Sequence, residues 1–197
     1  MTVAIIVPNT GTVHHNTVTS LTGLVWHTAK EACIPVGLEY HSPSIAGLAK
    51  VRNLGAELAL ANPNVTHTLW VDSDMTFPPD ALDRLLKWDK PIVGCAYSKR
   101  DGSSIVAAGM DGKQMTSIPK HGLHEVKVLG FGLILIQRSV FEKAEQPWFY
   151  EPYIDGYGPV GEDAYFLLEA GAKGFKTMMD ATLSREVGHL GTMEYKL

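Results

Sequence analysis

Short apolar segments alternate with helical patterns through the first half of this chain, and this alternation is the strongest constraint on its fold. Residues 3–7 form a continuous apolar run, typical of a strand covered on both faces. Residues 66–71 and 91–96 are further strand candidates, whereas residues 14–32 and 45–61 have helical character. The pattern predicts an α/β fold with a mostly parallel central sheet and helices on both faces.

The second half of the chain is less regular. Residues 98–127 are rich in Gly, Ser, Lys and His without a sustained period, so we expect loops and a short hairpin there. Strands are predicted at residues 128–137 and 175–179, with a helix at residues 161–170 between them. Because neither a repeat nor a linker divides the sequence, we expect a single domain over residues 1–197.

Charge and hydropathy limit the kinds of partner that this chain is expected to have. The formal net charge is −4 and the chain has no dense Lys/Arg run, which gives no support to a large nucleic-acid surface. The first residues lack the basic segment of a signal peptide, and no apolar stretch approaches the roughly 20 residues that span a bilayer. We therefore expect no membrane span and a cytoplasmic location.

Two carboxylates lie together at the end of a predicted strand. Asp72 and Asp74 flank Ser73 directly after residues 66–71, and residues two apart on an extended segment point to the same side. Adjacent carboxylates repel each other, and a divalent cation such as Mg²⁺ or Mn²⁺ relieves that repulsion. A bound diphosphate would supply further ligands. The alternative is a polar turn, because Asp-x-Asp alone is a weak signal.

The order and spacing of several motifs resemble the GT-A glycosyltransferases, particularly the compact family-2-like enzymes of phages and large viruses. The resemblance covers most of the chain and rests on PNT (8–10), LAKVRNLGAELAL (48–60), VDSDMTFPPDALDRLL (71–86), GFGLILIQRSVFEK (130–143), GEDAYFLLEAGAKGFK (161–176) and VGHLG (187–191). It implies one Rossmann-like GT-A domain, with a nucleotide-binding half at residues 1–100 and an acceptor-binding half at residues 101–197. The implied activity is metal-dependent transfer of a sugar from a nucleotide-diphosphate sugar to a hydroxyl acceptor.

The resemblance also implies a metal site. Asp74 corresponds to the direct ligand of Mn²⁺ or Mg²⁺, Asp72 to a contact with the ribose or with the metal through water, and His189 to a late ligand. A histidine ligand must be neutral, so donor binding is expected to weaken below about pH 6. The alternative for a lone histidine is a packed or exposed structural residue.

Contacts with the donor are implied at several further positions. The family's nucleotide-edge loop corresponds to Pro8, Asn9 and Thr10, and the helix positions that approach the nucleotide or diphosphate correspond to Arg52 and Asn53. A solvated helix face is the alternative for the last two. Gly132, like Gly130, would let the backbone approach the donor sugar. Lys99 or Arg100 would add positive charge near the diphosphate.

Glu162 and Asp163 match the acidic pair at the start of the family's acceptor-side helix. Inverting transfer needs a carboxylate that takes the proton of the acceptor hydroxyl, and we assign this role to Asp163, with Glu162 orienting it or binding acceptor hydroxyls. The alternative is favourable acidic charge in a first helical turn. In the aromatic loop that precedes them, Trp148 and Tyr150 are either an acceptor platform or a cap on the core.

Three functions remain open on the sequence. The first is sugar transfer to a glycan, a protein or a modified DNA base, of which DNA is disfavoured by the acidic balance. The second is nucleotidyl transfer, which is weakened because residues 8–16 lack the Lys or Arg of a basic phosphate loop. The third is a non-catalytic nucleotide-sugar-binding module.

Overall fold

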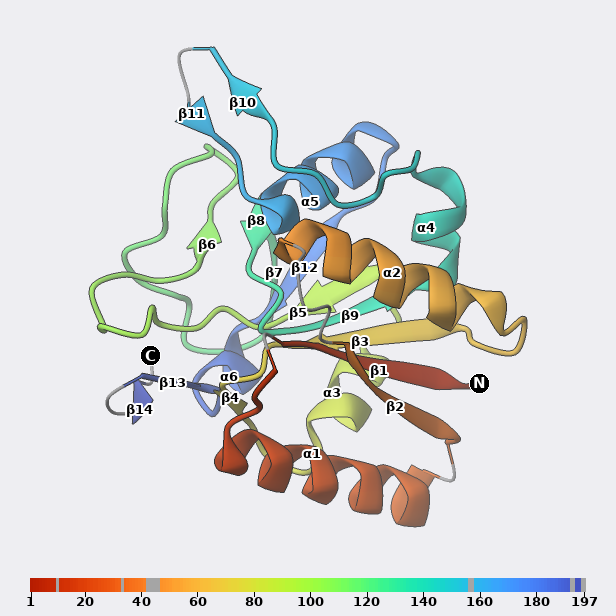
Figure 1. Ribbon diagram of the computed structural model, residues 1–197. Coiled ribbons are helices and arrows are strands. Elements are labelled where there is room, and N and C mark those ends of the chain that lie inside the picture. Colours follow the sequence, from red (N-terminus) through yellow and green to blue (C-terminus); the bar gives the residue numbers. More distant parts are fainter. Residues whose placement is uncertain (10, 33, 42–46, 156–157, 192–193, 196–197) are drawn as a thin grey trace.

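A computed structural model describes residues 1–197 except positions 10, 33, 42–46, 156–157, 192–193 and 196–197 (Figure 1). A seven-stranded sheet forms its centre. The strands lie in the order β2 (Val36–His41), β1 (Val3–Pro8), β3 (His67–Val71), β9 (Leu133–Gln137), β5 (Ile92–Gly94), β12 (Thr177–Asp180) and β7 (Leu123–Val126).

The sheet is mostly parallel, as the sequence predicts. Strands β2, β1, β3, β5 and β12 run in one direction, whereas β9 runs antiparallel to both of its neighbours and β7 antiparallel to β12. Because β9 is inserted between β3 and β5, the sheet interleaves strands from the two halves of the chain. The carboxyl ends of β3 and β5 therefore meet at one edge, where open α/β sheets bind ligands.

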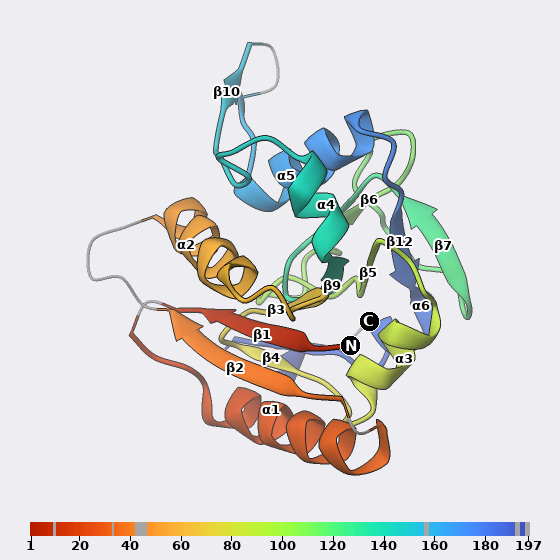
Figure 2. The ribbon, with the colours of Figure 1, turned by 90° about the vertical axis from the view of Figure 1, so that its right-hand side faces the viewer.

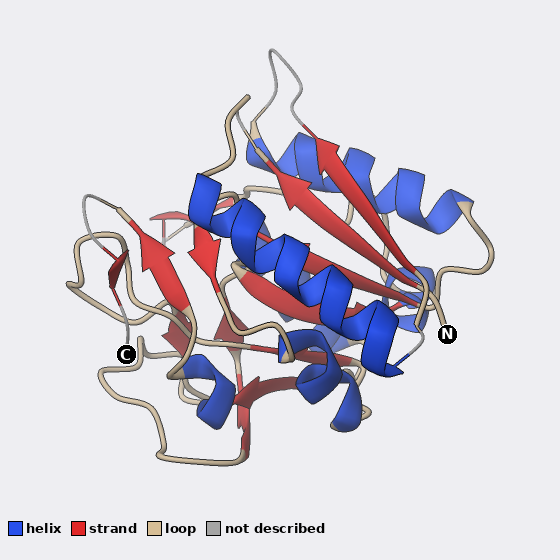
Figure 3. Ribbon diagram, turned by 90° about the horizontal axis from the view of Figure 1, so that it is seen from below, coloured by secondary structure: helices blue, strands red, loops and turns tan. Residues whose placement is uncertain are grey.

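Helices cover both faces of this sheet (Figures 2 and 3). One face packs against α1 (His15–His27) and α3 (Ala81–Lys87), and the other against α2 (Leu48–Ala61), α4 (Arg138–Lys143) and α5 (Glu162–Ala172). A short π-helix, η1 (Thr28–Ala32), continues α1, and α6 (Ala181–Ser184) follows β12. Among the described residues, no helix combines the length and apolarity needed to cross a membrane.

Strand β1 shows why the apolar run forms a central strand. Val3, Ile5 and Val7 pack into the cluster under α1 and α3, whereas Ala4 and Ile6 pack into the cluster under α2 and α5. Successive side chains of a strand point to opposite faces, so a strand covered on both sides must be apolar at every position. Burial of each Val or Ile side chain contributes about 1.5–3 kcal/mol.

Three small sheets surround the centre. They consist of β4 (Met75–Thr76) with β13 (Gly188–Leu190) and β14 (Glu194–Tyr195), of β6 (Ala107–Ala108) with β8 (Val128–Leu129), and of β10 (Tyr153–Ile154) with β11 (Gly158–Pro159). The first matters most for the site, because its antiparallel register places His189 opposite Met75.

Two predicted elements differ from the structure. The helix expected at residues 14–32 changes from α1 to the π-helix η1 after His27. The strand expected at residues 128–137 is two strands, β8 and β9, separated at residues 130–132. The interruption has a steric cause: the side chain of Tyr97 fills the space beside Gly130 and Gly132.

Candidate active site

Asp74 and His189 come together through the pairing of β4 with β13. Asp74 lies in the turn between β3 and β4, and its backbone carbonyl accepts a hydrogen bond from Leu190 N at 2.7 Å. This bond holds β13 beside the turn, and Nε2 of the preceding residue, His189, lies 3.3 Å from Asp74 Oδ2. Both side chains are mostly buried, with 12% and 15% of their surface exposed. The two residues that the sequence assigns to one metal site are therefore neighbours.

A backbone carbonyl orients the imidazole. The Nδ1 atom of His189 lies 2.8 Å from the carbonyl oxygen of Ser98, which is an acceptor only, so Nδ1 carries a proton. In the neutral ring the lone pair is then on Nε2, the atom that faces Asp74. Burial alone would lower the pKa of His189, but its bonds to Asp74 and Ser98 outweigh burial and raise it.

The carboxyl group of Asp74 is held in its ionised form. Burial opposes ionisation, but the hydrogen bonds and charges of His189 and Arg100 outweigh it and lower the pKa of Asp74. Arg100 Nε donates to Asp74 Oδ2 at 2.7 Å, and Arg100 Nη2 pairs with the same oxygen. Asp74 is thus an anion at neutral pH.

The chemistry of this pair fits a divalent cation. Two adjacent ligands of an octahedral ion at about 2.1 Å are about 3.0 Å apart, close to the separation of the two atoms here. Within the described part of the chain, no third His, Cys, Asp or Glu joins them. The remaining ligands would be water and diphosphate oxygens, as is usual for Mg²⁺.

Asp72, expected near this metal, is engaged elsewhere. Its Oδ1 accepts a hydrogen bond from Arg52 Nη2 at 2.8 Å, and Arg52 Nε donates to Glu162 Oε1 at 2.9 Å. Arg52 is almost fully buried, 1% exposed, and its guanidinium lies over the rings of Trp70 and Phe131. The charges of Asp72 and Glu162 outweigh the effect of burial and raise the pKa of Arg52.

The structure places Arg52 beneath the site, where it joins the end of β3 to the start of α5. The resemblance implies that this helix position approaches the nucleotide or diphosphate, which stays a prediction. Its Nη1 atom is buried and has no partner among the described residues.

Asn53 likewise points into the protein. Its Nδ2 donates to the carbonyl of Phe149 at 2.7 Å and to that of Ala49 at 2.9 Å, while its Oδ1 accepts from Phe149 N at 3.1 Å. These bonds use the whole amide to hold the loop before β10. The implied approach of Asn53 to the nucleotide or diphosphate stays a prediction.

Asp163 differs from its neighbour Glu162, which is paired with Arg52. Burial first, and then the charges of Glu162 and Asp72, raise the pKa of Asp163 to about 6, although Arg52 and the bond from Ala164 N oppose this. Its Oδ1 accepts that bond at 2.7 Å. A carboxylate with a pKa close to neutrality is able both to accept and to release a proton.

Tyr97 contacts both Gly132 and His189 and is not among the site residues predicted from the sequence. Its hydroxyl accepts a hydrogen bond from Gly132 N at 3.2 Å, and its ring packs edge-on against His189 with centroids 5.2 Å apart. A Cβ at Gly132 would lie 2.6 Å from this ring, and one at Gly130 would collide with the hydroxyl. Tyr97 thus occupies the space that a Cβ at these glycines would fill. Its position just after a buried strand, like that of Asp72, was the available signal.

The loop after β1 is attached to the Asp72–Asp74 turn. Asn9 Oδ1 accepts from Gly11 N at 2.9 Å, and Asn9 Nδ2 donates to Val7 O at 3.2 Å, which shapes the turn that follows Pro8. His14 N then donates to the carbonyl of Ser73 at 2.8 Å. Thr10 lies outside the described residues.

Solved structures of known proteins have a similar fold. The chain is similar to A197 from STIV, with a TM-score of 0.66, 17% identity, and coverage of 96% of this chain and 86% of that one. It is also similar to GalNAc-T7 solved with UDP, GalNAc and Mn²⁺, with a TM-score of 0.60, 13% identity and coverage of 100% of this chain. The chain has the GT-A glycosyltransferase fold. It spans 43% of the GalNAc-T7 chain. No protein-family model matches the sequence, and no curated protein matches it.

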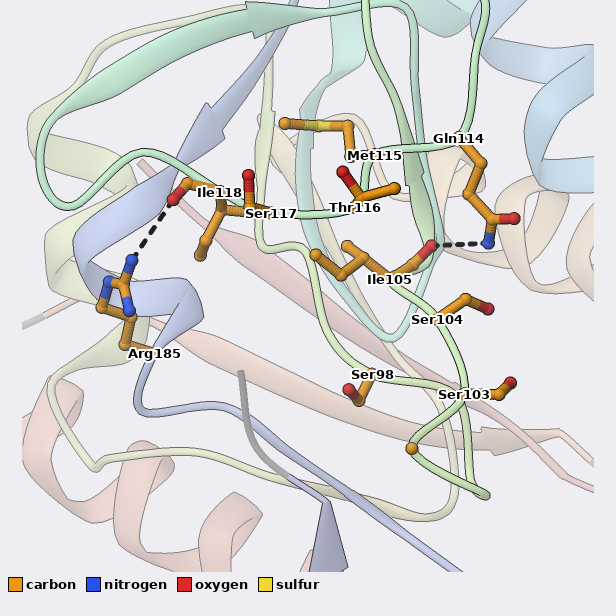
Figure 4. Close-up of a pocket in the computed structure, with 11 residues that line it drawn as sticks. Ser98, Ser103, Ser104, Ile105, Gln114, Met115, Thr116, Ser117, Ile118 and Arg185 are labelled. Carbon is orange, nitrogen blue, oxygen red and sulfur yellow. Dashed lines mark hydrogen bonds between the residues drawn. The ribbon is translucent and has the colours of Figure 1, made fainter.

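A pocket of about 440 Å³ is lined on one side by residues of the Ser98–Ile105 segment (Figure 4). Its lining combines hydroxyl and amide side chains with the apolar side chains of Ile105, Met115 and Ile118. Arg185 at its edge donates to the carbonyls of residues 118–120 and so holds the opposite wall. Ser98 belongs to both places, because it lines the pocket and its carbonyl orients His189.

Trp148 and Tyr150, predicted to be either an acceptor platform or a cap on the core, differ in the structure. Trp148 is buried, and its Nε1 donates to Phe141 O at 3.0 Å, so it caps the core. Tyr150 is 53% exposed and packs edge-on against Tyr165 of α5. Of these two residues, Tyr150 is therefore the one exposed to a ligand.

Proposed function

We propose that this protein is a metal-dependent glycosyltransferase that moves a sugar from a nucleotide-diphosphate sugar to a hydroxyl acceptor. The observation that carries the proposal is the 3.3 Å approach of His189 Nε2 to Asp74 Oδ2 at the carboxyl end of β3. A GT-A structure of similar fold, that of GalNAc-T7, contains UDP, GalNAc and Mn²⁺, which supports both the donor class and the metal.

Asp74 and His189 hold the divalent cation in this proposal. Mn²⁺ or Mg²⁺ bound there stabilises the negative charge that grows on the departing diphosphate. The Ser98 carbonyl keeps the imidazole lone pair directed at the site, and the β4–β13 pairing keeps the two ligands together. Asp72, fixed by Arg52, presents its second carboxylate oxygen to the nucleotide, and the loop at Pro8 and Asn9 borders the base.

Asp163 acts as the general base of an inverting reaction. The acceptor oxygen attacks the anomeric carbon, the bond from that carbon to the diphosphate oxygen breaks, and the hydroxyl proton passes to Asp163. With a pKa of about 6, Asp163 is mostly ionised at pH 7 and is a stronger base than an ordinary aspartate. Glu162 is paired with Arg52, and in this proposal it orients the start of α5.

Donor and acceptor are bound by different parts of the chain. We assign donor binding to residues 1–100, completed by His189, and acceptor binding to residues 101–197. The pocket bordered by Ser104 and Thr116, together with the exposed ring of Tyr150, supports the second assignment, because hydroxyl groups and aromatic faces suit a hydroxyl-bearing acceptor.

A thermal-shift panel of nucleotide-diphosphate sugars, each with and without Mn²⁺, tests the proposal. Binding to the native state raises the melting temperature by mass action, so the true donor should stand out only with the metal present. Asp74→Asn should abolish that shift, and Asp80→Asn, at a side chain that is 47% exposed at the start of α3, serves as the matched control. Shifts that are equal with and without Mn²⁺ for every donor would contradict the metal-dependent activity.

A further inference from the structure

Arg100 covers the oxygen that the metal would use. Its guanidinium contacts Asp74 Oδ2 through Nε at 2.7 Å and through Nη2, on the same oxygen that faces His189. The Arg100 side chain is 67% exposed, whereas that of Asp74 is 15% exposed. One exposed cation therefore pairs with one enclosed anion at the mouth of the site.

The main chain of Arg100 is fixed although its side chain is not enclosed. A Cβ at Gly191 would lie 2.5 Å from the carbonyl oxygen of Arg100, so these two backbones are in close contact. The hairpin that carries Arg100 is closed by the bond from Lys99 N to Ser104 O at 2.8 Å and by the bridge between Ser98 and Ile105. The side chain is thus free to leave Asp74 while the hairpin stays in place.

A guanidinium and a divalent cation compete for this position. Both need the charge of the same carboxylate, and two cations sharing one oxygen would repel each other. Asp74 has only one full charge to offer, and within the described residues no third acidic ligand adds another.

We propose that Arg100 is a displaceable counter-ion of Asp74 that a divalent cation must remove before it binds. The inference rests on the proposed metal site and adds a residue that sets its affinity. In the absence of metal, Arg100 pairs with Asp74 Oδ2, the oxygen that faces His189. When the metal binds, the guanidinium moves into solvent, and the metal affinity is lowered by the free energy of the lost ion pair.

Titration of the full-length chain with Mn²⁺, followed by the electron paramagnetic resonance signal of the free ion, tests this inference without any assay of activity. Arg100→Gln should lower the dissociation constant of Mn²⁺ about three- to tenfold, since an ion pair of this kind is worth about 1 kcal/mol. Lys99→Gln is the matched control, because it removes the same charge one residue away, and it should change the constant less than about twofold. Arg100 is exposed, so its replacement should not impair folding.

The outcomes separate the inference from the proposed function. If Arg100→Gln binds Mn²⁺ no more tightly than the wild type, or if Lys99→Gln has the same effect, the counter-ion role is wrong. If neither the wild type nor any variant binds Mn²⁺, and Asp74→Asn changes nothing, the metal site itself is wrong and the inference falls with it. Tighter binding confined to Arg100→Gln and lost again in Arg100→Gln/Asp74→Asn supports both.

Discussion

Arg52 Nη2 lies 2.8 Å from Asp72 Oδ1 in the centre of the protein, and the same guanidinium binds Glu162 through Nε. One buried cation therefore joins the turn after β3 to the first turn of α5. The two acidic motifs of the sequence share this partner, because Asp72 and Glu162 are both paired with it.

Removal of Arg52 should be costly. Arg52→Met leaves Asp72 and Glu162 without their partner, and loss of one member of a buried ion pair destabilises a protein by about 3–5 kcal/mol. Because the side chain of Asp72 is 26% exposed, we expect a value near the lower end of that range. Urea unfolding measures it. Arg84→Met removes a more exposed ion pair and should cost less than about 1 kcal/mol; equal losses in the two variants would contradict the account of Arg52.

Asp163 should make stability depend on pH. Its pKa is about 6 in the folded protein against an ordinary value of 3.8, so the folded state favours the protonated form. The resulting stabilisation is complete below the unfolded pKa and is lost as pH rises through about 6. Relative to Asp163→Asn, the wild type should lose about 1–3 kcal/mol of unfolding free energy between pH 4 and pH 8. Parallel curves for the two proteins would contradict the raised pKa.

The same group should shape the rate profile. If Asp163 is the general base, kcat/KM for sugar transfer rises with pH and levels off above about 6, because only the ionised carboxylate accepts the proton. Asp163→Asn should lower kcat by about 10²–10⁴-fold with little change in donor affinity. A variant that retains more than a tenth of the wild-type rate would exclude Asp163 as the base.

The glycines beside Tyr97 should not tolerate a side chain. Gly132→Ala places a Cβ 2.6 Å from the ring of a residue that is itself 4% exposed, and overpacking of this kind costs about 1–3 kcal/mol. Gly171→Ala is the control: a Cβ there meets nothing within 4 Å in α5, and it should stabilise the helix by about 0.5–1 kcal/mol. Thermal unfolding of both variants measures the contrast, and a neutral Gly132→Ala would show that Tyr97 does not restrict this position.

Local pattern was sufficient for the elements that are buried uniformly. The apolar run of β1 and strand β3, which ends just before Asp72, were predictable because a strand covered on both faces is mostly apolar. The direction of β9 was not, since antiparallel insertion between β3 and β5 depends on which strand fills a gap in three dimensions, a choice that its own sequence does not encode.

The candidate site shows the same contrast between features that local sequence predicts and features that depend on the folded chain. Motif order was enough to bring Asp74 and His189 into one prediction, and the two side chains are neighbours. Asn53 and Gly132 sit in equally suggestive motifs, yet their partners are Phe149 and Tyr97, which contact them only in the folded chain. Whether a polar residue faces a ligand or the interior is decided by such distant contacts, and sequence periodicity does not contain them.

The central claim is that Asp74 and His189 bind one divalent cation. Electron spin-echo modulation of Mn²⁺ added to the wild-type protein tests it directly, because a coordinated imidazole nitrogen gives a characteristic coupling. The account predicts that this coupling is present in the wild type and disappears in His189→Gln, and that Asp74→Asn weakens Mn²⁺ binding. Bound Mn²⁺ that shows no nitrogen coupling in the wild type, or the same coupling in His189→Gln, would contradict it.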